Sequence, residues 1–109
     1  MLFGLRNEIV EELKRIAQKY DYDFYVFGSR ARGDYKRNSD IDIAVVGNVQ
    51  DDEKMKIQID FDSIDMEYML DVVFVEDLTN RELIKNIEKE GVLIKWKDLK
   101  KEEKIWTMQ

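Results

Sequence analysis

The pattern of helical and strand segments along these 109 residues predicts a small α/β or α+β domain. Two observations carry this prediction: amphipathic helical stretches alternate with short β-rich stretches, and the chain has no internal repeat and no proline. A chain of this length builds one hydrophobic core, so we expect a single domain over residues 1–109. The expected architecture is a small mixed β-sheet flanked by helices.

The first part of the chain predicts one helix followed by two strands. Apolar residues recur at helical spacing from Phe3 to Tyr20, which is typical of an amphipathic helix. The aromatic stretch from Tyr22 to Phe27 predicts a strand, and residues Ile41 to Val46 predict another. Gly28, which follows the first of these strands, permits a tight turn.

The middle of the chain predicts a further helix and a third strand. Residues 51–64 fit two patterns: Met55, Ile59 and Phe61 favour a helix, whereas apolar residues at 57, 59 and 61 would also suit a strand. We favour the helix. Residues 70–75, LDVVFV, form an apolar run that is typical of a buried strand and is interrupted by a single charge.

The last part of the chain predicts a helix, a short strand and a tail. Thr79 and Glu82 have the spacing of a capping box, and Gly91 stands where the helix that follows would stop. Residues 92–94 predict a last short strand. Residues 97–109 are charged and end in apolar side chains, which indicates a frayed helix or a docking tail.

The composition excludes several classes of catalytic site. The chain has no cysteine and no histidine, which excludes disulfides, thiolate nucleophiles, serine–histidine triads and imidazole metal ligands. Carboxylates therefore remain as the candidate metal ligands and general bases. The sequence shows no apolar run long enough for a membrane span and no signal peptide, so we expect a cytoplasmic protein without membrane contact.

The charge of the chain is unevenly distributed. Residues 51–71 hold eight acidic and two basic side chains, which accounts for the whole net charge of -6. Residues 30–37 hold four basic side chains against Asp34 alone. We expect no strong general affinity for nucleic acid from such an acidic chain, but a local positive field around residues 30–37.

Two carboxylates begin the second predicted strand. Asp40 and Asp42 lie two residues apart, so both project from one face of the strand while the apolar residues point to the other. A rigid carboxylate pair suits Mg²⁺, although two solvated acids at a strand entrance would look the same. Asp71 interrupts an apolar strand and needs a partner. It would either join the pair around one or two metal ions or form an ion pair with Lys or Arg at the sheet edge.

The turn after the first strand has the residues of an anion-binding loop. Gly28 lets the backbone approach a phosphate, and Ser29 would donate a hydrogen bond and cap a short helix that Gly33 ends. Arg30 and Arg32 would add bidentate positive charge. Taken singly, each of these residues also fits an ordinary turn with solvated arginines.

The segment GSRARGDYKRNSDIDIAV, residues 28–45, closely resembles the signature of the DNA polymerase β-like nucleotidyltransferase superfamily. In that signature a Gly-Ser turn precedes a D-x-D strand, and here ten residues separate Ser29 from Asp40. The short chain and the Ala31-Arg32-Gly33 continuation resemble the minimal nucleotidyltransferases, a prokaryotic branch often paired with a HEPN-domain protein as an antitoxin. The resemblance covers about residues 3–96 and implies the nucleotidyltransferase fold.

The resemblance also implies a reaction and a metal site. Asp40 and Asp42 would bind Mg²⁺, and Asp71 would be the third acid, which completes the metal site or takes the proton of the attacking hydroxyl. Two Mg²⁺ ions would assist an acceptor hydroxyl that attacks the α-phosphorus of ATP, so that AMP is transferred and pyrophosphate leaves. In the paired antitoxin systems the acceptor is a tyrosine of the HEPN toxin.

The remaining motif residues take nucleotide-binding roles under the same resemblance. Gly28 and Ser29 would hold nucleotide phosphates, while Arg30 and Arg32 would lie near a phosphate or the partner. Little chain is left for an acceptor pocket, so we expect another protein or subunit to complete it, in a homo- or hetero-oligomer.

Two alternative functions stay open at the level of the sequence. The chain could neutralise its partner by binding alone, with residues 51–67 or the tail around Trp106 as the contact surface. It could also modify a small molecule, as the aminoglycoside nucleotidyltransferases do, although those relatives generally carry an added domain for the acceptor.

Overall fold

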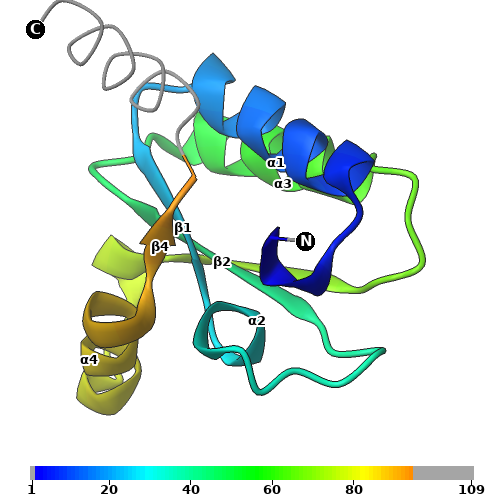
Figure 1. Cartoon of the computed structure of the whole chain (residues 1–109). Helices are drawn as coiled ribbons and strands as arrows, with labels where there is room; N and C mark the ends of the chain where they lie inside the picture. Colours follow the sequence, from blue (N-terminus) through cyan, green and yellow to red (C-terminus); the bar gives the residue numbers. More distant parts are fainter. Residues whose placement is uncertain (1, 95–109) are drawn as a thin grey trace, which may run out of the picture.

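The computed structural model describes residues 2–94, which form a mixed four-stranded sheet covered by helices (Figure 1). The strands are β1 (Asp23–Phe27), β2 (Ile41–Val46), β3 (Leu70–Phe74) and β4 (Val92–Leu93). Their order in the sheet is β3-β2-β1-β4, with β2 parallel to β3, and β1 antiparallel to both β2 and β4. The predicted fold class, a small mixed sheet flanked by helices, is confirmed.

The helices lie on both faces of this sheet. They are η1 (Leu2–Gly4), α1 (Asn7–Lys19), α2 (Ser29–Arg32), α3 (Asp51–Asp62), η2 (Val75–Asp77) and α4 (Arg81–Glu90). Figure 1 shows α1 and α3 side by side over one face, whereas α4 packs near β4 on the other. No helix among residues 2–94 is long and apolar enough to cross a membrane.

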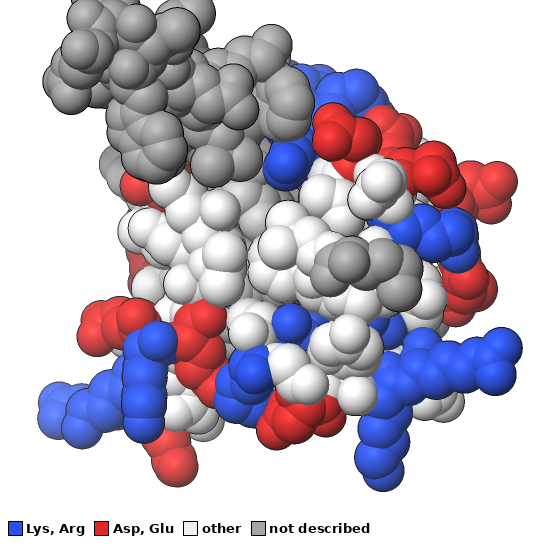
Figure 2. Space-filling view, viewed as in Figure 1, with Lys and Arg blue, Asp and Glu red and all other residues white. Residues whose placement is uncertain are grey.

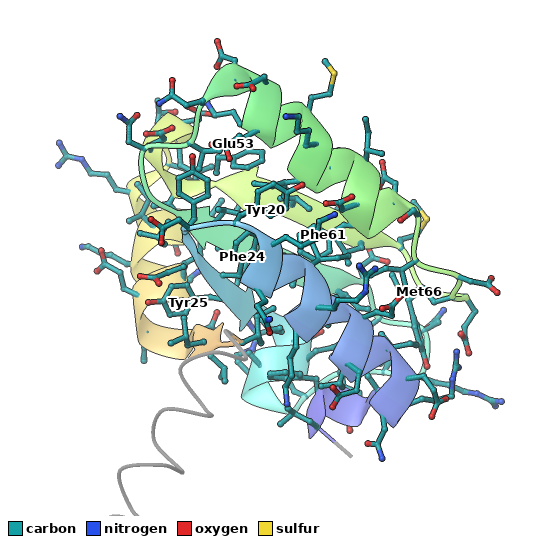
Figure 3. All side chains as sticks on the ribbon, turned by 90° about the horizontal axis from the view of Figure 1, so that it is seen from above. Tyr20, Phe24, Tyr25, Glu53, Phe61 and Met66 are labelled. Carbon is teal, nitrogen blue, oxygen red and sulfur yellow. The ribbon has the colours of Figure 1, made fainter. Side chains whose placement is uncertain are left out.

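The main core lies between the sheet and the α1–α3 layer. Phe24 of β1 is fully buried there, with its ring centroid 6.0 Å from that of Phe61 and 6.3 Å from that of Tyr20 (Figure 3). The side chains of Ile41, Ile43 and Val45 belong to the same core and are also fully buried. A smaller cluster on the opposite face contains Phe27, Ala44 and Ile87.

Segment α3 is a helix, as expected, but its buried face differs from the prediction. Ile57 and Phe61, four residues apart, face the core, whereas Met55 and Ile59 are 67% and 59% exposed. Apolar residues stand on both sides of this helix, so their spacing alone does not indicate which side packs against the sheet.

Three helix ends also differ from the prediction. Helix α1 begins at Asn7 rather than Phe3, because Phe3 and Gly4 have φ of 58° and 67° and interrupt the helical backbone. Asn80, not Thr79, caps α4, and its side chain accepts a hydrogen bond from the Leu83 amide at 3.1 Å. Gly28, not Ser29, is the N-cap of α2. The predicted tail at 97–109 lies outside the described residues.

Candidate active site

Two of the predicted metal ligands lie side by side on adjacent strands. Asp42 of β2 is the register partner of Asp71 in β3 and of Phe27 in β1. The alternation of β2 sends Ile41 and Ile43 into the main core, so Asp42 points to the opposite face, which carries α4. The third acid, Asp40, is exposed and lies just before β2. The fold therefore presents these carboxylates from rigid strands at one end of the sheet.

The Gly-Ser turn lies directly against Asp42. Gly28 follows β1 and has φ of 75°, a conformation that side chains other than glycine rarely adopt. A Cβ atom added at this position would stand 2.4 Å from Oδ2 of Asp42. Glycine is therefore required here both by the backbone conformation and by the close approach of a carboxylate. Ser29, the first residue of α2, is half-buried beside this contact.

The electrostatics of Asp42 are unfavourable for an isolated carboxylate. Burial raises the pKa of Asp42 to about 6, and the charges of Asp71 and Asp40 contribute further to the rise. Arg32 opposes the rise but does not cancel it. A cation bound between these carboxylates would remove the repulsion that raises this pKa.

The donor set suits a hard divalent cation. Asp40, Asp42 and Asp71 supply carboxylate oxygens, which Mg²⁺ prefers, and Asp42 holds its negative charge at an electrostatic cost that a cation would offset. Within residues 2–94, however, no three acidic side chains converge closely enough to form a preformed site. The side chains of Asp40 and Asp71 would therefore have to reorient around an ion.

Arg32 stands at the junction between the site and α4. Its guanidinium donates to Glu90 at 2.9 Å and to Asp34 at 3.2 Å, and its side chain is 45% exposed. Glu90 is the last residue of α4 and its side chain is 15% exposed. Figure 2 shows charged side chains of both signs along the lower edge of the molecule, beneath α2 and α4.

Arg30 occupies a different environment from Arg32. Its side chain is only 2% exposed, and its guanidinium donates to the backbone carbonyl oxygens of Ser39 and Phe3. The fold thus separates the two arginines that the sequence grouped as phosphate ligands: Arg32 stays at the surface, and Arg30 is buried in the loops around the site.

Comparison with known proteins agrees with this geometry. The family described as "Polymerase beta, Nucleotidyltransferase" matches residues 11–100, which is most of the chain. The chain belongs to this nucleotidyltransferase family. The chain is therefore a nucleotidyltransferase.

Solved structures share the nucleotidyltransferase fold. A structure described as a "toxin-antitoxin with AMP-PNP" has a TM-score of 0.61 at 21% identity, covering 78% of this chain and 71% of its own. A mutant of the toxin-antitoxin pair MntA-HpeT has a TM-score of 0.56 at 21% identity, covering 83% and 72%. These likenesses establish the fold. No curated protein matches the chain at a significant level.

Several residues around the site of this nucleotidyltransferase were not predicted from the sequence. Glu90 binds Arg32 from 58 residues away, and Tyr35 and Tyr68 contact the guanidinium of Arg30. No local pattern in the sequence identifies these residues, because each acquires its place through tertiary packing.

Proposed function

We propose that this nucleotidyltransferase uses Mg²⁺ to transfer AMP from ATP to a partner HEPN toxin and thereby acts as an antitoxin. The proposed acceptor is a hydroxyl group of the toxin, that of a tyrosine. The observation that carries the proposal is the pairing of Asp42 with Asp71 across β2 and β3, directly opposite Gly28. This pairing sets a carboxylate site directly against the backbone of a Gly-Ser turn.

In this proposal the residues of the turn bind the nucleotide. Gly28 has no side chain, so the Asp42 carboxylate lies directly against the backbone of the turn. A phosphate held by this backbone would be joined to Asp42 through a bound cation. The Ser29 hydroxyl would donate to a phosphate oxygen, and Arg32 at the surface would pair with a second phosphate after leaving Glu90 or Asp34. Arg30 donates to backbone carbonyls, so we assign it no direct phosphate contact.

Asp40, Asp42 and Asp71 would hold Mg²⁺. The bound ions would screen the phosphates and stabilise the attacking and leaving oxygens of an in-line displacement. In that displacement the acceptor oxygen forms a bond to the α-phosphorus, the bond from this phosphorus to the bridging oxygen of pyrophosphate breaks, and pyrophosphate leaves. Asp71 is exposed at the edge strand, so it would accept the proton of the attacking hydroxyl wherever it is not bound to metal.

A protein acceptor is supported by the surroundings of the site. Asp71 and Asp40 are exposed, and β3 forms the free edge of the described sheet. The two solved structures compared above are described as toxin-antitoxin structures, and the description of one names AMP-PNP, an analogue of ATP. Together these observations favour a toxin as the molecule that brings the acceptor hydroxyl to the carboxylates.

The test is the intact mass of the partner. The full chain would be purified together with the HEPN protein of its own genome, and the partner's mass recorded before and after incubation with ATP and Mg²⁺. The control is the double variant Asp40→Asn/Asp42→Asn, which keeps the size of both side chains but removes their charge. We expect a gain of one or more AMP groups that the double variant cannot produce.

The same experiment separates the alternative function. If the partner gains no mass, and the double variant still forms the complex and neutralises the toxin, the chain acts by binding alone. If the double variant loses both the mass gain and neutralisation, contact alone does not explain the antitoxin role.

A further inference from the structure

Arg30 is the one charged or polar side chain that is buried among residues 2–94. Burying a guanidinium costs free energy unless its donors are hydrogen-bonded. Its position next to the Gly-Ser turn, together with this cost, indicates that the side chain has a role beyond packing. The groups that satisfy it show which parts of the molecule it connects.

The guanidinium of Arg30 joins three segments through backbone oxygens. Nε and Nη2 donate to the carbonyl oxygen of Ser39 at 3.0 and 2.9 Å, and Nη1 donates to those of Phe3 at 3.0 Å and Gly4 at 3.5 Å. Ser39 immediately precedes Asp40 in the chain. Arg30 therefore connects helix α2 to the N-terminal segment and to the backbone from which Asp40 projects.

Two tyrosine rings flank the same guanidinium. The Cζ atom of Arg30 lies 4.6 Å from the ring centroid of Tyr68 and 5.2 Å from that of Tyr35. Tyr68 precedes β3 and stands three residues before Asp71. Tyr35 lies against Gly4, where an added Cβ atom would stand 2.3 Å from the tyrosine ring. Cation–π contacts of this kind are favourable when the guanidinium is withdrawn from water.

The segments that Arg30 joins are those that carry the candidate metal ligands. The Ile41 amide, just after Asp40, donates to the carbonyl of Met69, between Tyr68 and Asp71, at 2.9 Å. We call the segments 39–41 and 68–71, which this hydrogen bond joins, the β2–β3 junction. Arg30 contacts the first segment through the Ser39 carbonyl and the second through the Tyr68 ring. Arg30 thus contacts both segments that lead into Asp40 and Asp71, in addition to the pairing of β2 with β3.

We propose that Arg30 is a positioning residue, which fixes the backbones of Asp40 and Asp71 relative to the Gly28 turn through its contacts with Ser39 and Tyr68. The metal-binding consequence of this role rests on the proposed function. A lysine cannot replace it, because a single ammonium group does not supply the planar fork that reaches Ser39 and Phe3 together.

The first measurement does not depend on metal or activity. Amide hydrogen exchange would be recorded by NMR for the full chain and for Arg30→Lys, with Arg37→Ala, at an exposed arginine of the loop between α2 and β2, as the control. We expect the Ile41 amide to exchange about 10-fold faster in Arg30→Lys, because local opening of the junction becomes easier. The Ile94 amide, bonded to Phe24 across the sheet from this junction, should stay unchanged.

The second measurement reports on metal binding by the carboxylates. Binding of Mn²⁺ alone, without nucleotide, would be followed by calorimetry on the same variants. Residues that orient metal ligands alter metal affinity by about 10–100-fold, and we expect a loss near the lower end of this range in Arg30→Lys. Arg37→Ala should bind Mn²⁺ as the unmodified chain does.

A second pair of variants covers the case in which Arg30→Lys does not fold. Tyr68→Leu removes the ring beneath the guanidinium, whereas Tyr68→Phe keeps it, so only the leucine variant should accelerate Ile41 exchange and weaken Mn²⁺ binding. Equal acceleration at Ile41 and Ile94, or unchanged Mn²⁺ affinity in a folded Arg30→Lys, would overturn the positioning role and leave a structural one. If the unmodified chain binds no Mn²⁺, the proposed metal chemistry fails, and Ile41 exchange alone decides whether Arg30 fixes the junction.

Discussion

The two faces of the sheet differ in what covers them, although the same strand contributes to both. On one face, Ile41, Ile43 and Val45 of β2 are fully buried beneath α1 and α3. On the other face, Asp42 precedes Ala44, which is buried near α4, and Val46, which is 38% exposed. The first face is apolar and fully covered by helices, whereas the second is covered only in part.

This difference shows how a short chain carries both stability and a site. The α1–α3 face removes large apolar side chains from water and supplies most of the hydrophobic free energy of folding. The α4 face uses a small residue, Ala44, where the helix packs, and leaves Asp42 and Asp71 at the uncovered end. The electrostatic cost of the second face is offset by the packing of the first.

The largest expected effect comes from breaking the closed face. Ile43→Ala should lower the free energy of unfolding by about 3 kcal/mol, because it removes a fully buried side chain and leaves a cavity beneath α1 and α3. Val46→Ala, on the partly open face of the same strand, should cost about 0.5 kcal/mol or less. Chemical denaturation of both variants measures the difference, and equal losses would contradict the assignment of the two faces.

The next prediction compares two glycines that flank α2, and it separates the cost of backbone strain from the cost of a side-chain collision. Gly33→Ala places a side chain in the left-handed region, at φ of 96°, and should cost about 1–2 kcal/mol of stability. Gly28→Ala should cost about 1–3 kcal/mol, because φ of 75° with ψ of -157° is a conformation open essentially to glycine alone. Only at Gly28 would the new Cβ meet a carboxylate, since nothing lies within 4 Å of one added at Gly33.

Nucleotidyl transfer should therefore fall about 100-fold in Gly28→Ala, because a displaced carboxylate is misaligned for the reaction. Gly33→Ala should keep most of the activity when both variants are assayed below their unfolding temperatures. Similar activities in the two alanine variants would show that the approach of Gly28 to Asp42 has no part in the site.

A smaller effect tests the electrostatic cost of Asp42. Its folded-state pKa of about 6 lies above that of an ordinary aspartate, so the folded protein loses stability as the pH rises through 6. In metal-free buffer at pH 7.5, Asp42→Asn should therefore be more stable than the unmodified chain, by about 1–2 kcal/mol after allowance for solvent screening.

The pH dependence gives the sign of this effect. The advantage of Asp42→Asn should shrink as the pH falls from 6 and vanish only below the ordinary aspartate pKa of 3.8, where Asp42 is protonated in both the folded and the unfolded chain. Thermal melts of both proteins, from pH 8 down to about pH 3, would show it. An advantage that stays constant with pH would mean that burial and like charges do not act on this carboxylate.

Much of the fold and of the candidate site was predictable because it depends on local sequence. The strand Ile41–Val46 was predicted with its observed bounds, and the two-residue period of a strand determines which side chains share a face. The same alternation places Asp42 opposite the core. Gly33 ends α2 in the left-handed conformation, as expected for a glycine at a helix end.

The remaining features depend on contacts between distant segments. From the sequence, Arg30 was interpreted as a solvated or phosphate-binding arginine. In the structure its guanidinium donates to the carbonyl oxygen of Phe3, 27 residues away, and lies over the ring of Tyr68, 38 residues away. The core face of α3 follows from packing against the sheet rather than from spacing, which places apolar residues on both sides. Such choices are made by tertiary structure, and no local pattern predicts them.

The smallest expected effect concerns the start of α4, the helix that leaves the carboxylates uncovered. The side chain of Asn80 accepts a hydrogen bond from the Leu83 amide, so Asn80→Ala should cost about 1 kcal/mol of stability. Thr79→Ala, which alters the residue with the capping-box spacing, should change stability by less than about 0.5 kcal/mol. Denaturant midpoints of the two variants measure the difference. A larger loss at Thr79 than at Asn80 would contradict this assignment and show that Thr79 caps the helix, with α4 starting one residue earlier.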